Sequence, residues 1–361
     1  MDKTRIGIIC GGRSAEHEVS LQSAKNVIDA LDNGKFEPVL IGIDKSGLWS
    51  LYNQQDFLLN SDDPQKIRLN DNGVKLLVHP HSRSFRRLDT NADFTIDAAF
   101  PLLHGPFGED GTVQGLLKLM GIPFAGADVS GSAVGMDKDI MKRLLRDAGI
   151  RIGKFAVINA DNEPPSYKEA VCQVGEPFFV KPANMGSSIG VQKVHNENEW
   201  TLSIKEAFKY DTKVILEENI TGREIECAVL DGAELIVSPP GEVKPLHEFY
   251  SYEAKYIDKA GALLEIPAAL SGEKSQEIKE LAVKTFKTLC CAIFARVDFF
   301  LTKDGEVFVN EINTIPGFTK ISMYPKLLDQ CGIGYRELIT RIIESTILRF
   351  EKEAKLKTSY Y

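Results

Sequence analysis

The sequence has no hydrophobic run of the length that a membrane span requires. A transmembrane helix needs about 20 predominantly apolar residues, and no stretch of these 361 residues approaches that length. The apolar part of the opening segment MDKTRIGIICGG is also too short for a secretory signal peptide. We therefore expect a cytoplasmic protein with no membrane partner.

Blocks of basic charge are missing as well. Charged residues make up 26% of the chain and the formal net charge is -8, without a cluster of lysine and arginine. Proteins that bind nucleic acid or anionic membranes usually carry such a basic patch. Nucleic acid is thus not expected as a partner.

The six cysteines include no C-x-x-C pair and no spacing typical of a small disulfide-rich domain. Several of them lie inside apolar runs. We interpret them as buried, reduced thiols of a reducing compartment.

Two common phosphate-binding turns are also absent. The chain contains neither a G-x-x-x-x-G-K-[ST] loop nor a G-x-G-x-x-G turn. This argues against a P-loop enzyme and against a dinucleotide-binding Rossmann site. Any phosphate-binding residues must therefore belong to another kind of loop.

The chain does contain alternating strand and helix patterns. The apolar run 5–10 ends at Gly11-Gly12, and a helical pattern up to Leu31 and a second strand at 38–43 follow. Residues 52–92 are polar and turn-rich, which predicts short antiparallel strands. A further strand at 96–103 places His104 at its carboxyl end, where open α/β sheets bind ligands. These patterns predict an α/β (α+β) fold.

The remaining two thirds of the chain mix both kinds of pattern. Helices are predicted within 106–126 and at 136–148, 196–209, 273–290 and 338–347, and strands at 178–180, 191–194, 213–220 and 224–237. We interpret residues 238–245, SPPGEVKP, as a polar linker. No internal repeat occurs.

The segment 295–318, ARVDFFLTKDGEVFVNEINTIPGF, predicts a hairpin around Asp304-Gly305. Counting outward from a two-residue turn gives the pairs Lys303–Glu306, Leu301–Phe308, Asp298–Glu311 and Arg296–Asn313. Both carboxylates of the third pair therefore lie on one face.

Like charges directly opposite one another repel, so a positive group is expected between Asp298 and Glu311. Two carboxylates and the side-chain carbonyl of Asn313 form an all-oxygen set. Such a set suits Mg²⁺, which completes its shell with water and substrate phosphates. The alternative is a structural salt bridge in which Arg296 neutralises the pair.

The segment 181–190 could bind anionic groups of a nucleotide. Lys181 ends a strand and precedes PANMGSSIG, a loop whose amides and Ser187 and Ser188 hydroxyls could cradle anionic oxygens. Its glycines would let the loop act as a lid. The alternative is a surface hairpin with a lysine that extends into solvent.

Further candidates are Lys138 in GMDKDIMKRLL and the glutamates of ILEENITGREIE. Glu217, Glu218 and Glu224 could accept hydrogen bonds from an adenine amine or ribose hydroxyls. The alternatives are a solvent-facing lysine and a solvated run of charge.

Seven motifs, taken together, resemble the D-alanine–D-alanine ligase family of the ATP-grasp superfamily. In chain order they are GGRSAEHEVSLQSA, PLLHGPFGEDGTVQG, GMDK, VKPANMGSSIG, YEAKY, ARVDF and NEINTIPGFT. The resemblance implies an N-terminal α/β substrate-binding domain (1–125), a central ATP-grasp domain with the lid (126–220) and a C-terminal ATP-grasp domain with the metal hairpin (221–361). It also implies a homodimer.

The resemblance implies ATP-dependent ligation of two D-alanine molecules through an acyl phosphate, which supplies a peptidoglycan precursor for the cell wall. Lys138 and Lys181 would contact the phosphates of ATP, and Lys255 the transferred phosphate. Glu217 and its neighbour Glu218 would contact the adenine and Glu224 the ribose, while Ser188 would remain with the loop that cradles the anionic oxygens. Asp298, Glu311 and Asn313 would hold two Mg²⁺ ions, for which Mn²⁺ is a possible substitute.

The resemblance also assigns the substrate residues. Glu16, aided by His104, would bind the first ammonium group, and Ser322 with the amide of Met323 would bind the second carboxylate. Arg296 and the Gly317 N–H would stabilise the tetrahedral oxyanion. Glu16, Ser187 and Tyr256 would form a bridge that closes the lid, and Tyr256 favours an amine as second substrate.

Alternatives remain open at this stage. Glu16 could be a first-turn charge favoured by a helix dipole, and His104 a core imidazole with satisfied hydrogen bonds. The whole chain could be a ligase for another amino or hydroxy acid, or a nucleotide-binding sensor without catalysis.

Overall fold

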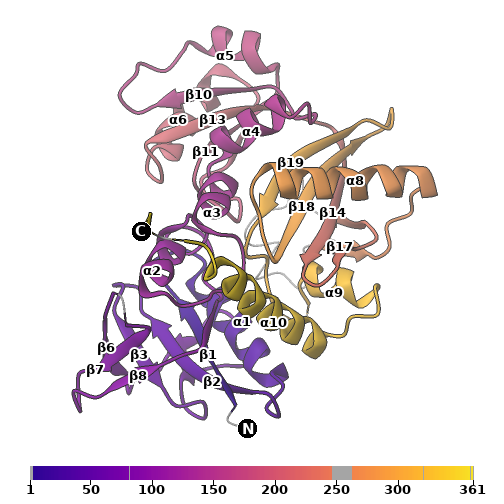
Figure 1. Ribbon diagram of the computed structural model, residues 1–361. Helices are drawn as coiled ribbons and strands as arrows, with labels where there is room; N and C mark the ends of the chain where they lie inside the picture. Colours follow the sequence, from indigo (N-terminus) through magenta and orange to yellow (C-terminus); the bar gives the residue numbers. More distant parts are fainter. Residues whose placement is uncertain (1–2, 81, 246–261, 320, 358, 361) are drawn as a thin grey trace.

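Three β-sheets follow one another along the chain, each with helices packed against it (Figure 1). The computed structural model describes residues 3–80, 82–245, 262–319, 321–357 and 359–360. Lys255 and Tyr256 lie outside these ranges. The mixture of parallel and antiparallel strands confirms the predicted α/β (α+β) class.

The first sheet is built around a buried parallel core. β1 (Thr4–Gly11) lies between β2 (Phe36–Ile43) and β9 (Ala98–Pro101), and both pairings are parallel. The near-continuous apolar run of β1 is typical of a strand covered on both faces. The sheet continues through four antiparallel strands, β3 (Trp49–Tyr52), β6 (Val74–Val78), β7 (Ser84–Arg87) and β8 (Asp93–Thr95), while β4 (Leu58–Leu59) and β5 (Arg68–Leu69) pair separately.

The second sheet has the order β10-β13-β11-β12. Its strands are β10 (Phe155–Asn159), β11 (Phe178–Pro182), β12 (Gln192–Val194) and β13 (Lys213–Glu218), with helices α5 (Tyr167–Val174) and α6 (Glu197–Ala207). Helices α1 (His17–Ala30) and α2 (Thr112–Met120) precede it in the chain. Two further helices, α3 (Val129–Met136) and α4 (Lys138–Asp147), then connect the first part of the chain to this sheet. The sequence did not reveal α3, because two serines and two glycines among its eight residues leave no clear apolar stripe.

The third sheet has the order β17-β16-β14-β18-β19, with β15 paired to β14. Its strands are β14 (Gly222–Asp231), β15 (Leu235–Val237), β16 (Gly241–Pro245), β17 (Ala262–Glu265), β18 (Phe294–Thr302) and β19 (Val307–Asn313). Helix α8 (Gly272–Thr288) lies between β17 and β18 in the chain, and α9 (Met323–Asp329) and α10 (Tyr335–Glu353) follow β19. The predicted linker 238–245 was wrong in its second half. Residues 241–245 form β16, because Glu242 reaches Arg223 on β14 and Val243 is buried.

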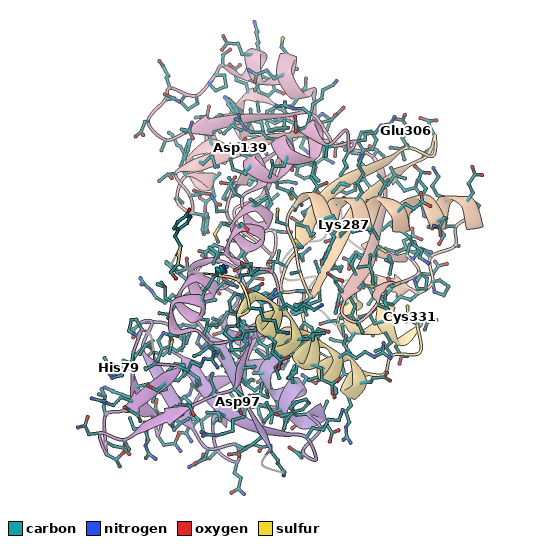
Figure 2. The ribbon with its side chains drawn as sticks, in the orientation of Figure 1. His79, Asp97, Asp139, Lys287, Glu306 and Cys331 are labelled. Carbon is teal, nitrogen blue, oxygen red and sulfur yellow. The ribbon has the colours of Figure 1, made fainter. Side chains whose placement is uncertain are left out.

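The β18–β19 hairpin confirms the two outer predicted pairs but not the predicted turn. The loop has three residues, 303–305, with Gly305 at φ 81°, and Thr302 N–H donates to the Glu306 carbonyl at 2.9 Å. Leu301 therefore faces Val307, not Phe308. A bulge then restores the outer register, so that Asp298 faces Glu311 and Arg296 faces Asn313. Glu306 at the tip of this hairpin (Figure 2) approaches Arg151, with Nη1 to Oε1 at 2.7 Å.

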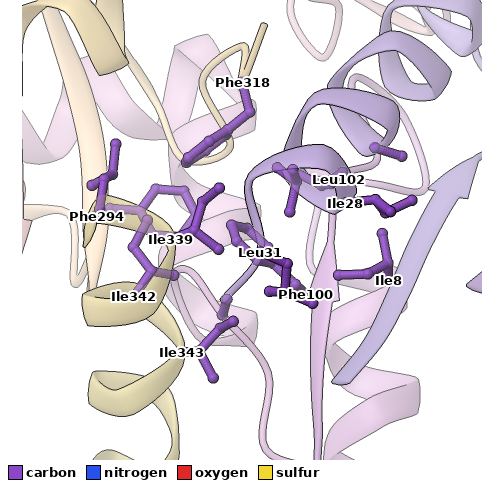
Figure 3. Close-up of a cluster of buried hydrophobic side chains, with 14 of the residues drawn as sticks. Ile8, Ile28, Leu31, Phe100, Leu102, Phe294, Phe318, Ile339, Ile342 and Ile343 are labelled. Atoms are coloured by element: carbon purple, nitrogen blue, oxygen red, sulfur yellow. The ribbon is translucent and has the colours of Figure 1, made fainter. Parts of the chain in front are cut away.

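The first and third sheets share one hydrophobic core through α10. Ile8 and Phe100 of the first sheet belong to the same buried cluster as Phe294 of β18 and Ile339 and Ile343 of α10 (Figure 3). Arg349 of α10 also donates hydrogen bonds to the carbonyls of Gly126 at 2.7 Å and Phe124 at 2.9 Å. The last helix thus fixes the first sheet to the third.

The cysteines are only partly as predicted. All six are free, but Cys172 and Cys290 are exposed, while Cys10 and Cys227 are buried, and burial raises the pKa of each of these two thiols to about 12. The prediction that all six are buried is therefore wrong for Cys172, in the last turn of α5, and for Cys290, just after α8, where the side chain faces solvent despite its apolar sequence neighbours. Within the described ranges, no helix combines the length and apolar character of a membrane span.

Candidate functional site

A cavity of about 310 Å³ lies between the second and third sheets. It is lined by residues of β11, β13, β14 and β19, of α4 and of the loop after β11. Eight predicted site residues line it: Lys138, Lys181, Ser187, Ser188, Glu217, Glu218, Glu224 and Glu311. These residues come from segments up to 173 residues apart in the sequence, and the fold brings them to one cavity.

Two lysines, the buried Lys142 and the largely buried Lys181, hold Glu217 inside this cavity. Its carboxylate lies 2.6 Å from Nζ of Lys142 and also pairs with Lys181. Burial favours the neutral carboxyl group, yet the two lysines outweigh burial and lower the pKa of Glu217 well below its usual range. Burial likewise opposes the charge of Lys181, but Glu217 raises its pKa. A solvated charge run at Glu217 and a solvent-extended Lys181 are therefore both wrong.

Lys138, the first residue of α4, points into the cavity. Its Nζ donates to the carbonyl of Met185 at 2.7 Å and lies 3.7 Å from Glu311 Oε2. Only 12% of the side chain is exposed, which contradicts the solvent-facing alternative. The Asp137 side chain caps α4 and so fixes where Lys138 emerges.

The loop after β11 adopts a strained conformation at its two serines. Ser187 and Ser188 have φ values of 51° and 60°, in the left-handed region that side chains disfavour. Such strain costs about 1–3 kcal/mol per residue and persists where surrounding contacts enforce it. One contact is the hydrogen bond from the Ser187 hydroxyl to the buried Glu16 carboxylate, which joins this loop to the head of α1.

Three carboxylates form a row across the third sheet. Glu226 on β14 faces Asp298 on β18, which in turn faces Glu311 on β19. Arg296 occupies the first gap: its Nε lies 2.7 Å from Asp298 Oδ1 and 2.9 Å from Glu226 Oε2. Burial disfavours its charge, but Asp298 and Glu226 raise the pKa of Arg296 well above its usual value.

The donor set beside Glu311 is small and contains only oxygen ligands. Among the described residues, no three His, Cys, Asp or Glu side chains gather as a complete metal cage. Asn313 donates through Nδ2 to Asp298 Oδ2 at 2.9 Å, which leaves its carbonyl oxygen as an acceptor. The predicted salt bridge of Arg296 is present at Asp298, whereas Glu311 lies closer to Lys138.

His104 and Glu109 both bind the backbone of Ile315. The carbonyl of Ile315 can only accept, so Nδ1 of His104 donates to it at 3.0 Å and Nε2 accepts from Ser23 at 3.3 Å. Burial lowers the pKa of His104 to about 4, so the ring is neutral at pH 7. In this arrangement His104 is a core imidazole whose two nitrogens are both bonded, as the alternative interpretation held.

Glu109 was not singled out from the sequence. Its carboxylate accepts from the Gly105 N–H at 2.8 Å and from the Ile315 N–H at 3.2 Å. Burial first, and the charge of nearby Glu16 second, raise the pKa of Glu109 to about 8. His104 and Glu109 together hold the loop that follows β19 against the first sheet.

That loop carries the other predicted substrate residues. A Cβ at Gly317 would lie 2.9 Å from Ser322 Oγ, so only a glycine fits there without displacing the serine. Ser322 Oγ also lies 2.7 Å from the Thr319 hydroxyl, and Met323 is buried at the start of α9. Gly317, one of the two predicted oxyanion residues, thus lies next to Ser322, one of the two predicted carboxylate residues.

Sequence reasoning missed Lys142, Glu109 and Glu226. Lys142 lies four residues after Lys138 on one helix face, a spacing that could have drawn attention to it. Glu226 alternates with Glu224 on β14, which places both on one face. Glu109 has no comparable signal, because its partners are backbone groups of two loops.

The chain matches known proteins along nearly its whole length. Residues 5–127 match the family described as D-ala D-ala ligase N-terminus, and residues 144–344 match D-ala D-ala ligase C-terminus. A D-alanine–D-alanine ligase of Oceanobacillus iheyensis is 49% identical over 99% of both chains. A D-alanine–D-alanine ligase A of Escherichia coli is 48% identical over 99% of this chain and 100% of its own.

Solved structures give the same result. The D-alanine–D-alanine ligase from Coxiella burnetii superposes with a TM-score of 0.85 at 35% identity, over 98% of this chain and 97% of that one. The VanG D-Ala:D-Ser ligase from Enterococcus faecalis superposes with a TM-score of 0.84 at 38% identity, over 96% of this chain and 100% of that one. The chain belongs to the D-alanine–D-alanine ligase family, whose members are ATP-grasp enzymes.

Proposed function

We propose that this protein joins two D-alanine molecules into D-alanyl-D-alanine at the expense of ATP, forming ADP and phosphate, and so supplies a precursor of the cell-wall peptidoglycan. The observation that carries the proposal is that eight predicted nucleotide and metal residues line one cavity. Family membership over nearly the whole chain supports it.

The nucleotide would bind between the second and third sheets. Lys138 and Lys181 would neutralise its phosphates, because both lysines are largely buried and face the cavity. Ser187 and Ser188 would cover the phosphates from the loop after β11, and Lys255 would approach the transferred phosphate. Glu217 and Glu218 would lie at the adenine and Glu224 at the ribose.

The residues present fit a divalent cation. Asp298, Glu311 and the carbonyl of Asn313 offer oxygen ligands on one sheet face, and an incomplete protein set suits an ion that shares phosphate oxygens and water. Two Mg²⁺ ions, or Mn²⁺ in their place, would offset negative charge on the transferring phosphoryl group.

The first D-alanine would bind through Glu16, whose buried carboxylate favours an ammonium partner. His104 would act by holding the loop at Ile315 in place. Ser322 and the Met323 N–H would bind the carboxylate of the second D-alanine. Its amine would attack the acyl phosphate formed by the first, while Arg296 and the Gly317 N–H stabilise the oxyanion.

The contact between Ser187 and Glu16 would close the loop over the substrates and exclude water. Tyr256 would complete this bridge. We keep as further parts of the proposal a homodimer, a cytoplasmic location, and domain boundaries at 1–125, 126–220 and 221–361.

The test is phosphate release from Mg²⁺-ATP with D-alanine, L-alanine, D-alanine plus D-lactate, D-alanine plus D-serine, or no amino acid, with the products identified by mass. Release with D-alanine alone, matched by D-alanyl-D-alanine, is the expected result. The likeness to a D-Ala:D-Ser ligase makes D-serine the competing second substrate. No release above background in any mixture would refute the proposal.

A further inference from the structure

Arg296 lies in the first of two gaps between three aligned carboxylates. The row runs Glu226, Asp298, Glu311 across adjacent strands, whose spacing is about 4.8 Å. Because Arg296 contacts both Glu226 and Asp298, it fills the gap on the β14 side. The cation proposed above would belong to the other gap, between Asp298 and Glu311.

The two positive groups would therefore share Asp298. Arg296 donates to both oxygens of this carboxylate, each at 2.7 Å, while Mg²⁺ requires a lone pair of the same group. A cation that binds Asp298 through the remaining lone pairs would compete with the guanidinium for the charge of this carboxylate and weaken their ion pair. An arginine with no second partner would oppose this change, because it would then be buried without a counter-charge.

Glu226 supplies the second partner. Its Oε2 lies 2.9 Å from Nε of Arg296, and only 10% of its side chain is exposed. It faces Asp298 from the side of β18 away from β19, so it does not belong to the gap next to Glu311. Its position suits contact with the arginine and not with the cation.

We propose that Glu226 is a positioning residue that holds Arg296 on the β14 side, so that Asp298 can bind a divalent cation while the arginine stays paired. This inference rests on the proposed ligase function and its metal site. Glu226 acts through Arg296, whose place beside Asp298 it fixes for the oxyanion step.

The test measures binding of the non-hydrolysable ATP analogue AMP-PNP to the full chain by calorimetry across a Mg²⁺ titration. Glu226→Gln should raise the Mg²⁺ concentration for half-maximal analogue binding about tenfold, without changing the weak binding seen in EDTA. Glu226→Asp, which keeps the charge, should stay near the unsubstituted protein.

Glu242→Gln is the matched control. Glu242 is also buried in the third sheet and also pairs with an arginine, Arg223. It lies on β16 opposite Ile225 of β14, and so outside the row of three carboxylates. It should lower thermal stability as Glu226→Gln does, without changing the Mg²⁺ requirement. An equal rise in the Mg²⁺ requirement of both variants would show that any buried carboxylate of this sheet has the same effect, and would overturn the proposal.

A double variant tests whether Glu226 acts through Arg296. Adding Arg296→Gln to Glu226→Gln removes the competing positive charge together with its second carboxylate partner, while Asp298 keeps the hydrogen bond from Asn313 Nδ2. The Mg²⁺ requirement should return to that of the unsubstituted protein. If it stays raised, Glu226 acts on the cation directly and the proposal is wrong.

The outcome also separates this inference from the proposed function. If the unsubstituted protein binds AMP-PNP equally well in Mg²⁺ and in EDTA, the metal site itself is refuted. If Mg²⁺ strengthens binding there and Glu226→Gln behaves in the same way, only the role of Glu226 is refuted.

Discussion

Glu109 makes the stability of this protein depend on pH near neutrality. Its partly buried carboxyl group lies between two backbone N–H donors, and its pKa is raised from 4.5 to about 8. The unfolded chain, in contrast, ionises this residue at its ordinary value. Between these two pKa values the folded state therefore binds more protons than the unfolded state.

The sign and size follow from proton linkage. Stability falls as pH rises wherever the folded state holds the extra proton, so the Glu109 contribution is fully present below pH 4.5 and is lost by about pH 8. A pKa difference of about 3.5 corresponds to about 5 kcal/mol at most, at about 1.4 kcal/mol per unit.

Glu109→Gln removes this dependence because an amide does not ionise. The amide offers one acceptor to two backbone N–H groups, which costs about 1–3 kcal/mol for the donor left unpaired. The variant should therefore be less stable than the unsubstituted protein at pH 5. The gap should close or reverse by pH 8.

Urea unfolding of both proteins at pH 5, 6, 7 and 8 measures this gap. Glu337→Gln, at a half-exposed carboxylate on α10 that pairs with Arg341, is the control and should show no comparable change. A stability difference between Glu109→Gln and the unsubstituted protein that stays constant from pH 5 to pH 8 would refute the raised pKa.

Three other substitutions test the site. Glu311→Gln should abolish turnover and the Mg²⁺ dependence of AMP-PNP binding with the fold intact by circular dichroism; normal activity with Mg²⁺ would contradict the metal assignment. Lys142→Met removes one partner of a buried ion pair, so urea unfolding should show a loss of about 3–5 kcal/mol together with a higher KM for ATP; unchanged values would show that Lys181 alone compensates Glu217. Ser187→Ala removes the bond to Glu16 and should raise the ratio of phosphate to dipeptide, and an unchanged ratio would exclude a role of this contact in lid closure.

The parts of the fold that the sequence predicted well are those with a one-dimensional signal. β1, β2 and β9 are apolar runs, and their positions follow directly from hydrophobicity. β16 carries Pro, Gly, Glu and Lys, and becomes a strand only through its partners on β14 and β17. Its assignment depends on tertiary pairing that local sequence does not report.

The hairpin shows how a correct pairing of the outer residues can follow from an incorrect turn. The loop is one residue longer than predicted, and the extra residue at the bulge, Asn310, restores the register of Asp298 and Glu311. The two deviations cancel. Burial also explains why Lys142 was missed: it belongs to a charged helix, and only in the folded protein is it buried, where it pairs with Glu217 of β13.

The core shared through α10 has a consequence for protein synthesis. Phe100 leaves the ribosome roughly 240 residues before Ile343, which packs in the same cluster, and this interval corresponds to about 10–50 seconds of translation. During that time α1 alone covers the apolar side of the nascent first sheet, and the part that α10 later covers stays exposed. The growing chain should therefore depend on chaperones that hold nascent polypeptides until the final helix has been translated.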